Sequence, residues 1–112
     1  MEPTVVDDPP AGRFEILVDG QVVGHLQYQR QGDTFSLTHT AIEPDFEGRG
    51  LGSKLAGGAL ATIRDQGGAV LPFCPFIRAY LQRHPEYLDL VPPDQRSRFQ
   101  LPAAAEPETR RP

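Results

Sequence analysis

Alternating apolar and polar residues predict β-strands in the first third of the chain. In residues 13–18, Phe14, Ile16 and Val18 occupy every second position, which is the spacing of a strand with one buried face. Asp19-Gly20 is a residue pair favoured in tight hairpin turns. Residues 21–29 are therefore predicted to form the return strand of a hairpin.

The next segments extend this hairpin into an antiparallel meander. In residues 21–29 the expected inward side chains are Val22, Leu26 and Tyr28, with Gly24 between them and His25 on the opposite face. A turn at residues 31–33 leads to a third predicted strand over 34–42. Its one face is expected to carry Phe35, Leu37, His39 and Ala41, and its other face Thr38, Thr40 and Ile42.

The hydrophobic period then changes to that of an α-helix. Apolar residues at Leu51, Leu55, Ala56, Ala59, Leu60 and Ile63 form one helical face. The pair Gly67-Gly68 is typical of a helix C-terminus, so the helix is predicted over about 51–66. Gly57-Gly58 inside it costs roughly 1 kcal/mol per glycine relative to alanine. Either the helix is strained or another element packs against its backbone.

A short strand and a second helix follow. Residues 69–73 are predicted as a buried strand, and Pro75 is expected at the first position of a helix that continues to about Arg83. A strand, a helix and a strand in this order imply a parallel pair with a right-handed crossover. The predicted fold class is therefore α/β (α+β), with a mixed sheet.

Composition divides the chain into one domain and two tails. Residues 1–12 and 102–112 are rich in proline, alanine and charge and have little to bury, so both are predicted to be disordered. Residues 13–101 are predicted to form a single domain, since 112 residues suffice for one hydrophobic core.

Charge and cysteine content exclude several functional classes. The formal charge of −4 and the pI near 5.2 argue against a nucleic-acid-binding surface. No apolar run approaches the ~18 residues of a membrane span, and the first residues do not resemble a secretory signal. A cytoplasmic protein without membrane contact is expected. A single cysteine, Cys74, permits neither an internal disulfide nor a cysteine-rich zinc site, and no bound metal is expected.

The most informative segment is the glycine-rich stretch at residues 46–53, between a predicted strand and a predicted helix. Gly48, Gly50 and Gly52 allow a tight turn that brings successive N–H groups to a ligand, and the helix adds the positive end of its dipole. Such a loop favours phosphate. It does not match a Walker loop, which needs lysine where Ser53 stands, nor a dinucleotide fingerprint, which needs Gly or Ala where Leu55 stands. The alternative is a loop that only joins strand to helix.

This stretch resembles the pyrophosphate loop of the GNAT superfamily of acetyl-coenzyme-A-dependent N-acetyltransferases. The superfamily pattern is Gln or Arg, two residues, Gly, one residue, and Gly or Ala, and here Gly50 and Gly52 take the glycine positions. Glu47 stands where Gln or Arg is usual, so no side-chain role is carried over to it. The resemblance implies that the cofactor is bound by Ile42, Gly48, Arg49, Gly50, Leu51, Gly52 and Ser53.

Further motifs narrow the resemblance to very short stand-alone members, the YjdJ-type subgroup, over residues 13–91. They are His39-Thr40, Cys74-Pro75-Phe76, Tyr80 and His84-Pro85-Glu86-Tyr87. The resemblance implies a minimal GNAT-like fold, acetyl-coenzyme A as acetyl donor and an amine as acceptor, in a monomer or homodimer. The acceptor, a small molecule or a protein, is not identified by these motifs.

Three residues are candidates for catalysis. Cys74 precedes a helix-starting proline, where the helix dipole favours thiolate, so it could accept an acetyl group or only line the site; it could also be a packed core residue. An imidazole accepts protons near neutral pH, which would suit His39 as a base, although a hydrogen-bonded core histidine is the alternative. Tyr80 is similar to the tyrosine that many GNAT proteins place near the leaving thiolate as a proton donor, and its alternative is packing.

Three functions remain open at this point. The first is an N-acetyltransferase that moves acetyl from acetyl-coenzyme A to an amine. The second is a non-catalytic acyl-coenzyme-A-binding or regulatory protein with the same fold. The third is a small interaction module with a purely structural glycine loop.

Overall fold

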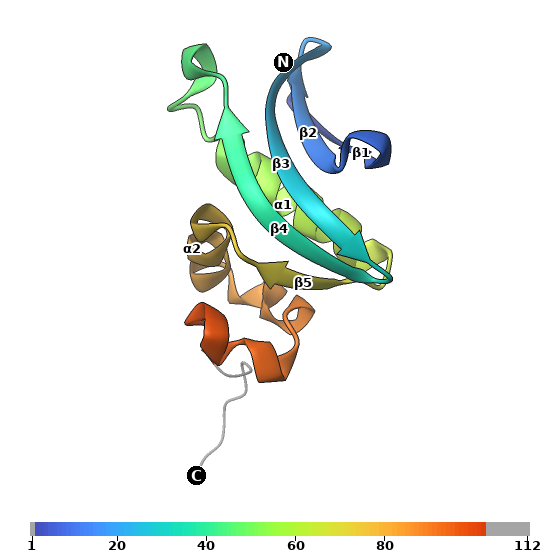
Figure 1. Ribbon diagram of the computed structural model, residues 1–112. Helices are drawn as coiled ribbons and strands as arrows, with labels where there is room; N and C mark the ends of the chain where they lie inside the picture. The colour runs from blue at the N-terminus through green and yellow to red at the C-terminus, as the bar shows by residue number, and fades with distance from the viewer. Residues whose placement is uncertain (1, 103–112) are drawn as a thin grey trace.

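The computed structural model describes residues 2–102 as a five-stranded mixed sheet with two α-helices (Figure 1). The elements are β1 (Thr4–Asp8), β2 (Arg13–Val18), β3 (Gln21–Gln31), β4 (Thr34–Ile42), α1 (Leu51–Asp65), β5 (Ala69–Pro72) and α2 (Pro75–Arg83). Strand order in the sheet equals order in the sequence. Neighbours from β1 to β4 are antiparallel, and β5 is parallel to β4. The predicted fold class is confirmed.

Helix α1 covers one face of the sheet, and α2 lies beside β5 (Figure 1). The six apolar residues expected on the inner face of α1 are all buried. They pack with the side chains that the strands direct to the same side, including Phe14, Ile16, Leu26 and Phe35. Burial of this apolar surface supplies most of the driving force for folding.

The glycine pair inside α1 has a packing reason. A Cβ added at Gly57 would lie 2.7 Å from the hydroxyl oxygen of Tyr80, and one at Gly58 would lie 2.8 Å from Cβ of Val5. Both separations are shorter than van der Waals contact. The expectation that another element packs against the helix backbone is confirmed, with α2 on one glycine and β1 on the other.

Residues 4–8 form strand β1, so the prediction of a disordered segment over residues 1–12 is wrong for them. The strand pairs with β2 from Thr4 opposite Leu17 to Asp8 opposite Arg13. The Tyr28 hydroxyl also donates a 2.7 Å hydrogen bond to the Asp7 carboxylate. Local composition does not reveal these partners, which lie elsewhere in the chain. The predicted C-terminal tail, apart from Pro102, lies outside the described residues.

Two β-bulges change which side chains face the core. In β3, Gly24 lies opposite Ile16 but Val22 lies opposite Leu17, which leaves Val23 as the extra residue. Val23 is fully buried and Val22 is exposed. The expectation that Val22 points inward is therefore wrong.

The second bulge lies in β4 and shifts its C-terminal half. His39 pairs with Gln27 and Leu37 with Tyr28, so Thr38 has no partner of its own. A one-residue shift moves the following side chains to the other face of the strand. Thr40 and Ile42 consequently share the inner side with Leu37. The prediction that His39 and Ala41 share a face with Leu37 is wrong.

After α2 the chain continues as short 3-10 turns rather than long helices. These are Pro85–Leu90, Pro93–Gln95 and Ser97–Phe99. They bury Leu88, Leu90, Val91, Phe99 and Leu101 against the lower part of the core. Arg96 is buried with them and donates a hydrogen bond from Nε to the Val91 carbonyl at 3.0 Å.

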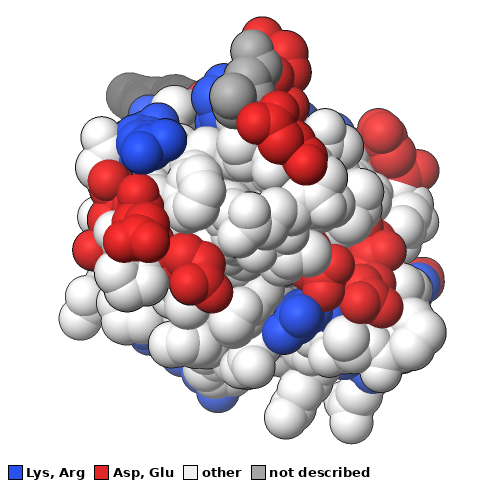
Figure 2. Space-filling model, turned by 90° about the horizontal axis from the view of Figure 1, so that it is seen from above, with Lys and Arg blue, Asp and Glu red and all other residues white. Residues whose placement is uncertain are grey.

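The surface matches the acidic composition. Figure 2 shows the end of the molecule that carries the loop after β4, where acidic side chains form separate groups around a largely uncharged centre and basic ones are fewer. Within residues 2–102, no helix combines the length and apolar character that crossing a membrane requires.

Candidate functional site

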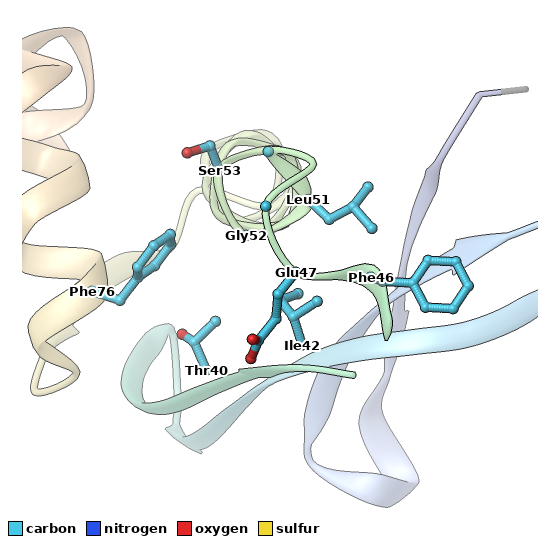
Figure 3. Close-up of a pocket in the computed structure, with 10 residues that line it drawn as sticks. Thr40, Ile42, Phe46, Glu47, Leu51, Gly52, Ser53 and Phe76 are labelled. Carbon is cyan, nitrogen blue, oxygen red and sulfur yellow. The ribbon is translucent and has the colours of Figure 1, made fainter. Parts of the chain in front are cut away.

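A cavity of about 320 Å³ lies where β4, the glycine-rich loop and α2 meet. Its lining residues are Thr40 and Ile42 from β4, Phe46, Glu47, Gly48 and Gly50 from the loop, Leu51, Gly52 and Ser53 from α1, and Phe76 from α2. Figure 3 shows the start of α1 above the end of β4, with Phe76 approaching from the side. Six of the seven residues predicted to bind cofactor line this cavity.

The cavity exists because β4 and β5 separate. Strand β5 pairs only with the first half of β4, from Thr34 to Leu37. Just after β5, the Cys74 N–H donates a further hydrogen bond to the Leu37 carbonyl, with the nitrogen and oxygen 2.9 Å apart. Among residues 2–102, no strand continues along this edge of residues 38–42. Backbone groups of β4 on that edge are therefore open to a ligand.

The loop before α1 holds two glycines in the left-handed region. The φ angles of Gly48 and Gly50 are 81° and 76°, values that favour glycine. A Cβ at either residue would meet no protein atom within 4 Å. Glycine is favoured at both positions by the backbone conformation and not by crowding from other protein atoms. The space that a side chain would occupy there is open. At Gly52 the situation differs, because a Cβ there would lie 2.9 Å from the Phe76 ring.

The start of α1 makes this end of the cavity attractive to anions. Gly50 is the N-cap of a 15-residue helix whose first turn contains no acidic residue. The first N–H groups of a helix have no intrahelical acceptor and form the positive end of the helix dipole. One carboxylate, that of Glu47, also lines the cavity and points toward β4 in Figure 3. An anion is therefore expected to bind at the amide groups of residues 50–53 rather than beside the Glu47 carboxylate.

Arg49, the seventh predicted cofactor-binding residue, lies outside this cavity. Its Nη2 donates to the Asp45 carbonyl at 3.4 Å. Its guanidinium lies over the Phe46 ring, 5.1 Å from the ring centroid. The side chain is exposed on the other side of the loop.

Cys74 is connected to the cavity through Thr40. The Cys74 sulfur and the Thr40 hydroxyl oxygen are 3.3 Å apart, and either can donate the hydrogen bond. Cys74 is the N-cap of α2 and is only 4% exposed. Its location before the helix is as predicted, while its burial limits access to the thiol.

Tyr80 is not among the residues that line the cavity. Its hydroxyl packs against Gly57 in α1, and its ring stacks on His84 with centroids 4.2 Å apart. Burial raises the pKa of the Tyr80 phenol, and the nearby Tyr87 and Glu86 raise it further. The phenol is therefore protonated near neutral pH. His84 ends α2, as its place before proline predicts.

His39 lies on the face of β4 that points away from the cavity. It is exposed, and its ring centroid is 6.1 Å from that of His25 on β3. Burial lowers the pKa of His25, and the charges of Arg13 and His39 lower it further. Within the described part of the chain, no hydrogen bond joins any two of Cys74, His39 and Tyr80. Of these three residues, none lines the cavity, and in the described part of the chain only Cys74 is hydrogen-bonded through its side chain to a residue that does, Thr40.

Sequence reasoning did not assign a site role to Thr40, Phe46, Glu47 or Phe76, all of which line the cavity. Phe46 and Glu47 fall inside the predicted loop, so their proximity could have been anticipated. Thr40 becomes important only through the bulge, which has no clear sequence signal. Phe76 reaches the cavity because α2 packs across the start of α1, which is a tertiary contact.

The family is shown by a match over residues 13–90 to the model described as GCN5-related N-acetyl-transferase. The chain therefore belongs to the GCN5-related N-acetyltransferase family, as the resemblance of its motifs indicated. A comparison with curated proteins gave no match.

One solved structure shares this fold over most of both chains, and two others match over smaller parts. The solution structure of a GCN5-like protein from Staphylococcus aureus matches with a TM-score of 0.60 at 18% identity, covering 80% of this chain and 87% of that chain. The ribosomal-protein-S18-alanine N-acetyltransferase from Escherichia coli gives 0.48 at 24% identity, covering 52% and 38%. A GNAT family acetyltransferase from Brucella melitensis in complex with acetyl-CoA gives 0.48 at 25% identity, covering 61% and 50%. The chain thus spans half or less of the latter two proteins.

Proposed function

We propose that this protein is an N-acetyltransferase that transfers acetyl from acetyl-coenzyme A to an amine. The observation that carries the proposal is the position of the cavity. It joins the N-terminus of α1 to an open edge of β4 and reaches the Thr40–Cys74 pair. Family membership supports the same reaction class.

The residues present fit the pyrophosphate of coenzyme A. Amides at the start of α1 can donate to its oxygens, and the helix dipole favours its charge. The positive φ angles of Gly48 and Gly50 turn the backbone there without placing side chains in the open space. Glu47 disfavours an anion on its own side, so the phosphates are expected against residues 50–53.

The rest of the cavity suits an extended chain that contains amides. Ile42, Leu51 and Phe76 provide apolar walls. The open edge of β4 provides backbone donors and acceptors, which a peptide-like ligand can satisfy in the manner of an added strand. When bound, acetyl-coenzyme A supplies an activated thioester for the transfer.

Direct transfer is favoured over a covalent acetyl-cysteine. A direct reaction requires the protein to hold the amine and the thioester in attack geometry, which alone gives a large rate advantage. A covalent route requires an accessible Cys74 thiolate. The sulfur of Cys74 is within hydrogen-bond distance of the Thr40 hydroxyl, and the residue is only 4% exposed. Cys74 and Thr40 are therefore proposed to line the reacting end of the cavity.

Calorimetry and mass spectrometry together test this function. Titration with acetyl-coenzyme A should show binding in the micromolar range or tighter, and a panel of amines should yield at least one product heavier by an acetyl group. Binding without any acetylated amine would contradict catalysis and favour an acyl-coenzyme-A-binding role. Absence of binding would contradict both.

A further inference from the structure

Two of the three histidines in the chain lie beside each other on the face of the sheet that α1 does not cover, which is called the outer face. His25 lies on β3 opposite Ala41, and His39 lies on β4 opposite Gln27. The two histidines are therefore diagonal neighbours on adjacent antiparallel strands, within reach of each other's side chains. Their ring centroids are 6.1 Å apart. Neither residue lines the cavity of the proposed function.

This pair exists because of the bulge in β4. Thr38 has no partner of its own, and the resulting shift turns His39 to the outer face, on the same side as His25. The Thr38 hydroxyl also donates a hydrogen bond to the Gln27 carbonyl at 3.2 Å, which adds a link between the two strands at this point. Paired backbones therefore hold both histidines, and the positions of their rings relative to each other are set mainly by side-chain rotation.

The ring nitrogens of both histidines are available to a ligand. His39 is exposed, and His25 is half-buried and lines a cavity of about 530 Å³ on the outer face. Within residues 2–102, neither imidazole takes part in a hydrogen bond or a salt bridge. The third histidine, His84, differs in that its ring stacks on Tyr80 and its Nδ1 lies 3.6 Å from a Glu86 carboxylate oxygen.

The charges around the pair nearly balance. Glu15 lies directly opposite His25 on β2, and its carboxylate accepts a hydrogen bond from Nε of Arg13 at 2.9 Å. Arg13 and Glu43 line the same outer cavity as His25. A cation between the two rings would therefore have two carboxylates and one guanidinium in its surroundings, so its charge is not opposed overall.

We propose that His25 and His39 together bind one divalent transition-metal ion of the Zn²⁺, Ni²⁺ or Cu²⁺ class between β3 and β4. Neutral imidazole is the commonest protein ligand of such ions. With metal–nitrogen distances of about 2.0–2.1 Å, two imidazoles on one ion place their ring centroids roughly 5–6.5 Å apart. The observed separation lies within this range, so side-chain rotation can direct both rings to one ion while the paired strands stay in place.

The protein supplies two ligands, and water completes the coordination. Within residues 2–102, no three His, Cys, Asp or Glu side chains are arranged to hold a metal ion. The affinity should therefore be moderate, in the micromolar range or weaker. Mg²⁺ and Ca²⁺ prefer oxygen ligands and should not bind here. A single cysteine excludes a cysteine-rich zinc site but has no bearing on an imidazole pair.

Calorimetry with Ni²⁺ tests the site, on protein without a histidine tag because a tag would compete for the ion. Wild type should bind one ion. His25→Gln and His39→Gln should each weaken binding roughly tenfold or more, because either change leaves a single imidazole without the advantage of a second ligand on the same protein. His84→Gln is the matched control and should keep the wild-type affinity.

Two further measurements report on the rings and on the folded state. In NMR spectra of the histidine rings, Zn²⁺ should shift the signals of His25 and His39 and leave those of His84 unchanged. An ion that binds only the folded protein stabilises it, so Ni²⁺ should raise the thermal unfolding midpoint of wild type but not of the two single variants. The midpoints without metal show whether each variant is folded.

The possible outcomes distinguish a shared site from separate histidines. Loss of binding in both single variants but not in His84→Gln, with shifts confined to the two predicted rings, supports the site. Single variants that keep the wild-type affinity, with or without half the number of bound ions, would overturn it, because each histidine would then bind alone. Absence of binding to wild type would overturn it as well. None of these measurements involves coenzyme A, so such failures would leave the proposed function unaffected.

Discussion

The two halves of β4 differ although they belong to one strand. Residues 34–37 are paired on both sides, with β3 and β5, and their apolar side chains Phe35 and Leu37 are fully buried. Residues 38–42 are paired with β3 alone and contribute Thr40 and Ile42 to a cavity. The first half, residues 34–37, is called the closed half, and it stabilises the fold. The second half, residues 38–42, is called the open half, because one edge of its backbone carries no further strand of the described chain and its side chains Thr40 and Ile42 face a cavity.

The bulge at Thr38 marks the change between these halves. Without it, His39 and Ala41 would face α1 and the loop, and Thr40 would point away from Cys74. One additional residue thus places the Thr40 hydroxyl group in the cavity and beside Cys74. The comparison predicts that mutations in the first half reduce stability and that mutations in the second half reduce binding or turnover.

The largest effect is expected for Leu37→Ala in the closed half. Truncation of this fully buried leucine should cost about 2–5 kcal/mol of unfolding free energy, because it removes apolar contacts and leaves a cavity. Urea denaturation measures the loss. Thr40→Val in the open half is the matched variant and should change stability by less than about 1 kcal/mol. Similar losses in both variants would contradict the division of β4.

Gly50→Asp is expected to have the next largest effect. The added carboxylate would lie beside bound phosphate, and such like-charge contacts cost several kcal/mol, so coenzyme-A affinity should fall about a hundredfold or more. Gly32→Asp is the control, because Gly32 also has positive φ and open space around its Cβ but lies in the β3–β4 turn. Calorimetry on both folded variants decides, and unchanged affinity in Gly50→Asp would remove the loop from the site.

Tyr28 of β3, which pairs with Leu37 in the closed half and contacts the Phe35 ring, makes stability depend on pH. Burial raises the pKa of Tyr28 to about 12, and its hydrogen bond to Asp7 and the Asp7 charge contribute. The pKa of Tyr28 in the folded state is above the unfolded value near 10. The protonated phenol therefore contributes fully to folding stability below pH 10, and this stabilisation is lost as pH rises toward 12. Denaturation from pH 9 to 12 should show a steeper decline for wild type than for Tyr28→Phe. Equal declines in the stability of wild type and Tyr28→Phe would contradict a raised pKa of Tyr28 in the folded protein.

Cys74→Ala tests the open half where Thr40 contacts Cys74, which is the proposed reacting end of the cavity. With direct transfer, loss of the Thr40 hydrogen bond should reduce turnover by no more than roughly tenfold. Wild-type protein mixed with acetyl-coenzyme A alone should show no stable added acetyl mass. Steady-state kinetics and intact-protein mass spectrometry provide the measurements. An acetyl adduct in wild type, lost together with turnover in Cys74→Ala, would establish the covalent route instead.

The smallest effect is expected for His39→Ala. His39 is exposed on the side of β4 away from the cavity, so its removal should change coenzyme-A affinity by less than about twofold, as for most surface substitutions. Calorimetry checks the affinity, and kinetics with an acetylated amine checks turnover. A large loss of turnover at unchanged affinity would mean that the acceptor approaches from the outer face of the sheet.

Much of the fold was predictable because its elements have strong local signals. The 3.6-residue period of α1, the Asp19-Gly20 turn, and Pro75 at the start of α2 each depend on neighbouring residues alone. The conflict between Gly57-Gly58 and helix propensity correctly indicated a close packing contact. The position of the cavity followed from the glycine-rich loop, whose backbone requirements are visible in the sequence.

The features that were predicted wrongly, which are the two bulges and strand β1, share one physical cause. Each is determined by contacts with residues that are distant in the sequence. Residues 38–41 are threonine, histidine, threonine and alanine, which differ little in hydrophobicity, so the bulge could not be located from the sequence. The bulged residue Val23 follows another valine and precedes a glycine, so the sequence does not show which valine faces the core. Strand β1 depends on Gly58 and Tyr28, which lie far along the sequence.

The agreement between strand order and sequence order has a consequence for how the molecule folds. Strands β2, β3 and β4 each pair with the strand that precedes them in the sequence, so these loop closures are short and their entropic cost is low. Proteins dominated by such local pairings fold rapidly. The β4–β5 pair is the exception, because it must close around the whole of α1. The cavity lies just beyond that pairing, where β4 and β5 separate, so ligand-binding competence should appear only after the β4–β5 pair has formed.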